Sequence, residues 1–197
     1  MRIVTLLTAM GLALASPVNA ATIPSSGRLD FDVIRKGKDI GDHSYKFSGS
    51  ANALSVQVTT DIIVKVPIIR TTAYSFKHNS VEKWSGNKLV KVSSETNDDG
   101  TPHQLNTGGN GVLPASLWNI DAMHDGKLLN TVDGTIMPVR VSDLGAETIP
   151  VKGGQIKAHH YRLSQGLSRD LWFDNEGNLA RVAFKADDGS TVTYVRK

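Results

Sequence analysis

The chain of 197 residues contains no cysteine. Disulfides, thiolate nucleophiles and thiolate metal ligands are therefore excluded from its chemistry. Runs of basic residues are also absent, because 22 Lys and Arg are scattered among 19 Asp and Glu, so the chain lacks the electrostatic footprint of a nucleic-acid partner. After residue 20 no stretch stays apolar for the roughly 18 residues that a membrane-spanning helix needs. The sequence therefore predicts no nucleic acid among the partners and no integral membrane segment in the mature chain.

The first twenty residues have the pattern of a secretory signal peptide. Arg2 is followed by a nearly unbroken apolar run from Ile3 to Ala15 and then by the small-x-small sequence Val18-Asn19-Ala20. We expect cleavage after Ala20, export to the periplasm, and a single mature domain over residues 21–197. The lack of cysteine fits a bacterial periplasm.

Strict alternation of apolar and polar residues dominates the segment from Leu54 to Val66. Leu54, Val56 and Val58 begin an apolar face that continues through Val66, and Ile63 is the exception on the polar face. A period of two over this length predicts a long strand with one buried face.

Similar stretches recur along the chain, separated by Asp-Gly and Asn-Gly turns that suit tight hairpins. They cover residues 29–34, 42–48, 68–78, 88–96, 155–163, 169–173, 178–185 and 191–196. Nine or ten strands joined by short turns predict an all-β, mainly antiparallel fold, a meander curled into a barrel or half-barrel.

One segment, Leu113 to Ile120, has a helical pattern. Pro114 suits a first helical turn, and Leu113, Leu117 and Ile120 are spaced by four and three residues. We expect one short helix on the concave side of the sheet. The alternative is an irregular loop anchored by Trp118.

Two hairpin segments share a layout of tryptophan, glycine turn, Leu-x-x-Val strand and Asp-Asp-Gly turn. The first runs from Trp84 to Thr101, and the second runs from Trp172 to Ser190. An acidic residue, Glu82 or Asp170, precedes each tryptophan by two positions. Duplication of one hairpin unit and convergence of turn chemistry both account for this similarity.

The sequence offers no strong catalytic or metal motif. The six histidines form no His-x-His or His-x-x-x-His pair, and no Gly-x-Ser-x-Gly elbow occurs, so we predict neither a metal site nor a cofactor. Asp174 to Asn178 is a hairpin turn that lacks the alternating ligands of a calcium loop. Glu82 and Asp170 are the best candidates for a pair of catalytic carboxylates. The sequence therefore assigns no catalytic residue.

Aromatic and aliphatic side chains on the predicted strands favour a hydrophobic interior. A curved sheet with an apolar concave face can leave a cavity for an acyl or isoprenoid chain, or its side chains can fill that space completely. The candidate lumen residues are Val56, Val58, Ile62, Val64, Tyr74, Phe76, Trp84, Trp118 and Trp172.

The order of several motifs resembles a family of bacterial exported proteins of unknown function. These motifs are Ile63-Val64-Lys65-Val66, Tyr74-x-Phe76-x-His78, Glu82-x-Trp84-x-Gly86-x-x-Leu89, Thr96, Asp99-Gly100, Leu113-Pro114-x-Ser116-x-Trp118-Asn119 and Leu171-Trp172-Phe173-Asp174-x-x-Gly177. The family is similar in layout to half-barrel carriers of the outer-membrane lipoprotein and lipid-transport type. The resemblance implies a sheet that wraps a helix and shelters a lipid moiety. The mature chain has no lipobox cysteine for an anchor.

Three hypotheses for function follow. The first is a soluble, non-catalytic periplasmic protein that binds or shields a hydrophobic, lipid-like ligand. The second is an envelope-assembly or protein-interaction module with a filled core, whose partner is an envelope protein. The third is a hydrolase of an envelope polymer or lipid, with Glu82, Asp170 or a histidine as acid or base. The sequence favours the first and a protein without enzymatic activity.

Overall fold

The computed structural model describes residues 22–66, 68–69 and 71–197. The predicted signal peptide and its cleavage site after Ala20 lie outside these described residues. Thirteen strands form one sheet in the order β6-β5-β4-β3-β2-β1-β13-β12-β11-β10-β9-β8-β7. All neighbours pair antiparallel except β7 and β8, which are parallel. The strands are β1 (Arg28–Arg35), β2 (Lys38–Ser50), β3 (Ala53–Lys65), β4 (Thr72–Ser85), β5 (Lys88–Asp98), β6 (Thr101–Gly108), β7 (Leu113–Pro114), β8 (Gly126–Leu129), β9 (Ile136–Val151), β10 (Gly154–Gln165), β11 (Arg169–Asp174), β12 (Leu179–Lys185) and β13 (Thr191–Arg196).

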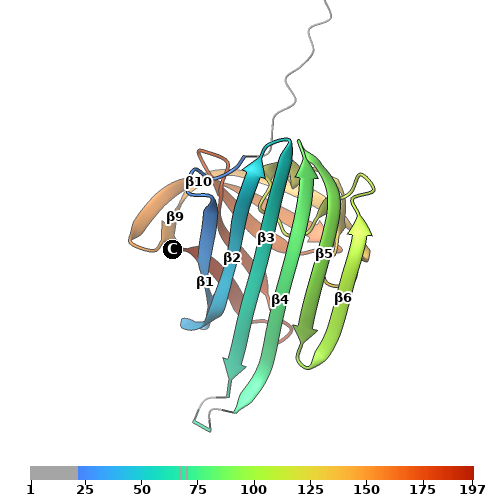
Figure 1. The fold of residues 1–197 in the computed structure, drawn as a ribbon. Coiled ribbons are helices and arrows are strands. Elements are labelled where there is room, and N and C mark those ends of the chain that lie inside the picture. The colour runs from blue at the N-terminus through green and yellow to red at the C-terminus, as the bar shows by residue number, and fades with distance from the viewer. Residues whose placement is uncertain (1–21, 67, 70) are drawn as a thin grey trace, which may run out of the picture.

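The sheet curls strongly but its two edge strands, β6 and β7, do not pair with each other. Figure 1 shows β1 to β6 across the front, with the later strands turning behind them. The predicted all-β, mainly antiparallel architecture is therefore confirmed, in the form of an open half-barrel.

The two-residue period explains why β3 forms where the sequence predicts it. Leu54, Val56, Val58 and Ile62 are buried, while Gln57 and other alternate residues are exposed. Burial of one face fixes the register, because a slip of one residue would move every apolar side chain into water.

The sequence pattern misses strands β6, β7, β8 and β9, and β9 is the longest strand of the sheet. β9 has 16 residues, contains Pro138 and Pro150, and buries only Val139 and Ile149. Apolar residues alternate only at its start, at Met137, Val139 and Val141, and the remaining residues carry no such pattern. β9 is held along its length by pairing with β10. Just after its end, Lys152 N donates a hydrogen bond to Arg196 O on β13 at 2.9 Å.

The predicted helix over Leu113–Ile120 is wrong, and the irregular loop is correct. Leu113–Pro114 is the short strand β7, and Leu117 has φ of +65°, which breaks right-handed helical geometry. Only a 3-10 turn, η1 (Ile120–Ala122), forms in this region, capped by Asn119, whose side chain accepts a hydrogen bond from Asp121 N. No α-helix occurs within the described ranges.

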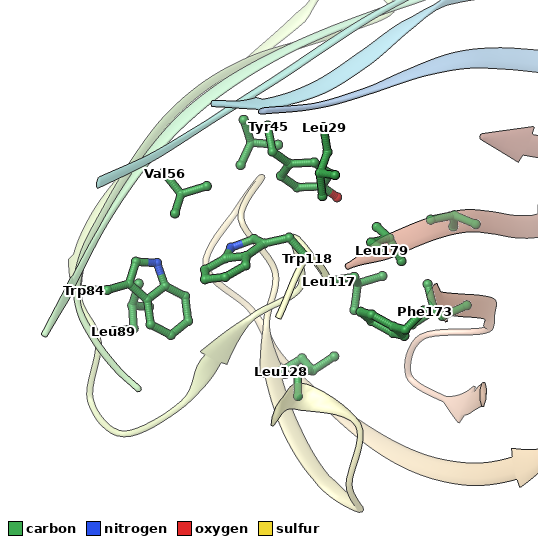
Figure 2. Close-up of a cluster of buried hydrophobic side chains, with 14 of the residues drawn as sticks. Leu29, Tyr45, Val56, Trp84, Leu89, Leu117, Trp118, Leu128, Phe173 and Leu179 are labelled. Atoms are coloured by element: carbon green, nitrogen blue, oxygen red, sulfur yellow. The ribbon is translucent and has the colours of Figure 1, made fainter. Parts of the chain in front are cut away.

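This loop fills the space between the two halves of the curled sheet. We call residues 113–124 the plug. Trp118 and Leu117 point into the interior, where Trp84 lies beside the Trp118 indole (Figure 2). The ring centroids of Trp84 and Phe47 lie 5.2 and 5.1 Å from that of Trp118. Trp118 is 2 % exposed and belongs to one continuous apolar cluster that includes residues from β1 to β12. The plug end of the half-barrel is a packed core.

The two similar hairpins differ in their turns. Leu89 lies opposite Trp84, whereas Leu179 lies opposite Phe173, so the second turn is one residue longer. As a result Trp84 faces the interior and Trp172 faces the opposite side of the sheet. These differences favour convergence over duplication.

The approach to the plug requires glycine at position 109. A Cβ atom there would lie 1.6 Å from the backbone oxygen of Leu89, while a Cβ at Gly108 would have no neighbour closer than 3.8 Å. We expect Gly109→Ala to lower the free energy of unfolding by about 1–3 kcal/mol, because backbone atoms must shift to admit the methyl group. Gly108→Ala is the matched control. Chemical denaturation of both variants is the measurement, and equal losses would contradict this account of the packing.

Candidate functional site

The predicted lumen residues do not line one open cavity. Val56, Val58, Ile62, Trp84 and Trp118 are 0–7 % exposed within the packed interior.

The other predicted lumen residues lie elsewhere. Val64 and Phe76 pack in a smaller cluster with Val33 and Val192. Tyr74 is 36 % exposed, and Trp172 packs on the outer face with Ile149 and Ala158.

A buried carboxylate holds the plug to the sheet. Oε2 of Glu82 accepts hydrogen bonds from Trp84 Nε1 at 3.0 Å and Trp118 Nε1 at 2.9 Å, and the side chain is fully buried. Burial raises the pKa of Glu82, and the hydrogen bonds from the indoles oppose that rise. A hydrogen-bonding contribution from Ser116 on the plug also opposes the rise in the Glu82 pKa.

Beyond the plug, the interior contains two histidine–threonine pairs. His43 Nδ1 lies 2.7 Å from Thr60 Oγ1, and His78 Nδ1 lies 2.7 Å from Thr96 Oγ1. Burial lowers the pKa of His43 to about 3 and that of His78 to about 4, so both rings are neutral at pH 7. The ring of Tyr194 lies 4.9 Å from that of His43. The described residues contain no group of three or more side chains placed to hold a metal ion.

The two candidate catalytic carboxylates lie on opposite faces of the sheet. Glu82 bonds to the plug inside, whereas Asp170 Oδ1 lies 2.8 Å from His160 Nε2 and accepts from Arg162 Nε at 2.8 Å outside. Leu171, the residue after Asp170, points into the core, which places Asp170 on the outer face. These two carboxylates therefore cannot act on one bond.

An open groove of about 1050 Å³ lies at the end of the half-barrel opposite the plug. It forms because β2 leaves β3: the last pair between them is Gly41 with Ile62, and Ile40 is the extra residue of a bulge against β1. Gly41 permits this close crossing, since a Cβ there would lie 1.9 Å from the backbone oxygen of Asp61. The β3 residues beyond Ile62 pair only with β4. We call this hollow the end groove; its apolar lining is Ile40, Ile63, Val64, Val66, Ile68 and Ala73.

Charged residues border the end groove with a surplus of positive charge. Arg35 and Lys36 share the single carboxylate of Asp188, at 2.7 and 2.9 Å. Lys38 and Lys65 also line the groove and form no ion pair among the described residues.

The acidic residues of the end groove are mostly neutralised. Asp61 pairs with Lys77 at 3.6 Å, Asp42 pairs with Lys197 at 2.5 Å, and Asp39 accepts from the Gly41 backbone N–H. The groove therefore presents an apolar floor and a cationic border.

Of the predicted ligand-binding residues only Val64 lines this groove, because the site depends on where two strands part. Further signals in the sequence were Ile63, the apolar residue on the polar face of β3, and Ile68 beyond the strand.

The fold identifies the class of protein as an open, plugged β half-barrel. The chain belongs to the family described as Domain of unknown function (DUF6134), whose model matches residues 31–197. A solved structure titled as a beta-barrel-like protein of Domain of Unknown Function DUF1849 from Brucella abortus is similar at a TM-score of 0.53 and 11 % identity, over 86 % of this chain and 94 % of that chain. The comparison with curated proteins gave no match. No helix among the described residues is long and apolar enough to cross a membrane.

The neutral buried histidines predict acid sensitivity. Their depressed pKa values mean that the folded state binds fewer protons than the unfolded state below pH 6.5. Stability conferred by the neutral rings is complete above pH 6.5 and is lost as the pH falls toward 4 and 3, by up to about 1.4 kcal/mol per pH unit for each ring. We expect His78→Gln to flatten this decline in thermal melts, whereas His124→Gln, at an exposed site, leaves the decline unchanged. An equally steep loss of stability in the wild type, His78→Gln and His124→Gln would show that His78 does not cause the acid sensitivity.

Glu82 predicts a pH dependence of opposite sign. Because burial raises its pKa in the folded state, its contribution is most favourable below the ordinary value of 4.5 and weakens as the pH rises through the folded value. Gln at this position keeps an acceptor for both indoles without a charge. We expect the stability of Glu82→Gln relative to wild type to increase between pH 4.5 and 8 in paired denaturation curves. Glu82→Leu, which removes the acceptor, should destabilise by about 1–3 kcal/mol. A pH-independent difference for Glu82→Gln would show that the carboxyl keeps its ordinary pKa.

Proposed function

We propose that the protein is a non-catalytic, exported binding protein for a hydrophobic, lipid-like ligand, and that the ligand occupies the end groove rather than the lumen. One observation carries the proposal: the end groove is a large hollow with an apolar floor, while the predicted lumen around the plug is packed with side chains. The periplasmic location rests on the signal-peptide pattern of residues 1–20.

The size and lining of the groove support a small amphiphile. Its volume of about 1050 Å³ lies at the upper end of the range of ligand sites in proteins. Apolar contact with residues such as Ile63 and Val66 would supply affinity at roughly 25 cal/mol per Å² of buried surface. The cationic border would suit a negatively charged head group.

A second candidate function is a protein-interaction module for envelope assembly. The filled core supports it, and so does the edge of β3, where residues 63–65 have no partner on β2. An extended segment of another protein would add to that edge as a further strand. The hydrolase hypothesis loses its main candidates, because Glu82 and Asp170 lie on opposite faces.

Binding of an apolar fluorescent probe to the mature protein tests the site. We expect 1-N-phenylnaphthylamine to bind, and Ile63→Ser combined with Val66→Ser to weaken its binding by about tenfold, since two aliphatic contacts are lost. The control is Val90→Ser, at a residue that is 55 % exposed and lies on β5.

Native mass spectrometry of the protein purified from its own periplasm would then identify the ligand. An extra mass released by organic solvent supports the proposal. Absence of probe binding would favour the interaction module, and probe binding that is equally strong in the double variant would place the ligand elsewhere.

A further inference from the structure

The end of the half-barrel beside the groove carries an apolar tip. The paired strands β3 and β4 project beyond β2 and β5 at this end (Figure 1). Ile68 in the turn between them is 99 % exposed and Ile69 is 67 % exposed. Two adjacent isoleucines in water at a projecting turn are unusual, because the same turn works with polar residues.

The backbone conformation of Ile68 is one that isoleucine rarely adopts. Its φ is +76°, in the left-handed region that favours Gly and Asn. A β-branched residue with positive φ is strained, and nothing in the fold needs the Ile68 side chain, since it is almost fully in solvent. A strained and exposed isoleucine is therefore best explained by what its side chain contacts outside the protein.

Cationic side chains accompany the tip. Lys65 lies at the end of β3, and Arg35, Lys36 and Lys38 border the end groove next to Ile68. Asp188 is shared by two cations, and Asp42 and Asp61 are paired to other lysines. The carboxylates of Asp98 and Asp99 lie on the β5 side, where they accept hydrogen bonds from Tyr74 and Ser75, so the positive charge beside the tip is confined to its groove side.

These features fit a bilayer better than a protein partner. A stable protein interface needs about 800 Å² per partner with matched shape, and a projecting pair of isoleucines offers neither. A bilayer accepts a small apolar tip without shape complementarity, and anionic lipid head groups attract nearby lysines and arginines.

We propose that the β3–β4 tip docks the protein on a membrane that contains anionic lipid, with Ile68 and Ile69 inserted among the head groups. Lys65, Lys38 and Lys36 then contact the lipid phosphates. Docking would place the mouth of the end groove against the bilayer. Docking does not require an occupied groove, so it can be tested independently of the proposed ligand.

Vesicle sedimentation of the mature protein tests the proposal. We expect binding to vesicles of phosphatidylcholine with phosphatidylglycerol, and weaker binding both to phosphatidylcholine alone and at high salt. Ile69→Asn should weaken binding about tenfold, because the inserted aliphatic side chain is lost. Leu144→Asn is the matched control, since Leu144 is 47 % exposed on β9, away from the tip.

A second variant separates docking from folding. Asn tolerates a positive φ, so Ile68→Asn should keep or raise the thermal midpoint while it weakens vesicle binding; a merely structural isoleucine would show the reverse. Ile69 does not line the groove, so Ile69→Asn should still bind the fluorescent probe in the absence of vesicles.

Three results would overturn docking: no binding of the wild type to either vesicle, equal binding to both, or unchanged binding in the tip variants. Loss of probe binding alone would instead count against the proposed ligand site. Capture of a protein by the tip without vesicle binding would show that the occupant is a polypeptide.

Discussion

A curled sheet that does not close must cover its concave apolar face with something, and in this protein the plug does so. The interaction that the rest depends on is the hydrogen bonding of one buried carboxylate oxygen of Glu82 by the indoles of Trp84 on the sheet and Trp118 on the plug. Two N–H donors that would be costly to bury unpaired are satisfied at a single acceptor. The carboxyl thereby ties the plug, which contains only the two-residue strand β7 and the 3-10 turn η1, to a fixed place in the core.

Because the plug occupies one end, the half-barrel has two unequal ends. Near the plug the interior is a packed apolar cluster around the buried Glu82, and in the middle it contains neutral histidines that bond to threonines of the neighbouring strands. At the far end β2 separates from β3, and the end groove opens there. The end groove is formed by this separation and not by the apolar face of β3, whose side chains Leu54, Val56 and Val58 pack in the core.

The similarity to the DUF1849 structure, at 11 % identity, shows the fold alone. A half-barrel of this kind depends on apolar alternation and turn chemistry, which many sequences satisfy. The isoleucines of the β3–β4 turn do not follow these rules of alternation and turn chemistry. Ile68 satisfies neither the turn geometry nor the core, so it is the residue at which local preference and observed conformation conflict.

The sequence by itself determined the strands that have one buried face, such as β3 and β1, because alternation is a local property of neighbouring residues. It also determined the absence of thiol chemistry. The course of β9 and the loop structure of the plug were decided by tertiary contacts: β9 is held by pairing with β10, and Leu117 adopts a conformation that no helical spacing predicts. The end groove likewise exists only because β2 and β3 part at Gly41. Residues 35–42, 61–66, 68 and 73 meet there because of strand pairing. Sequence patterns report periodicity along one segment, not the point at which two segments separate.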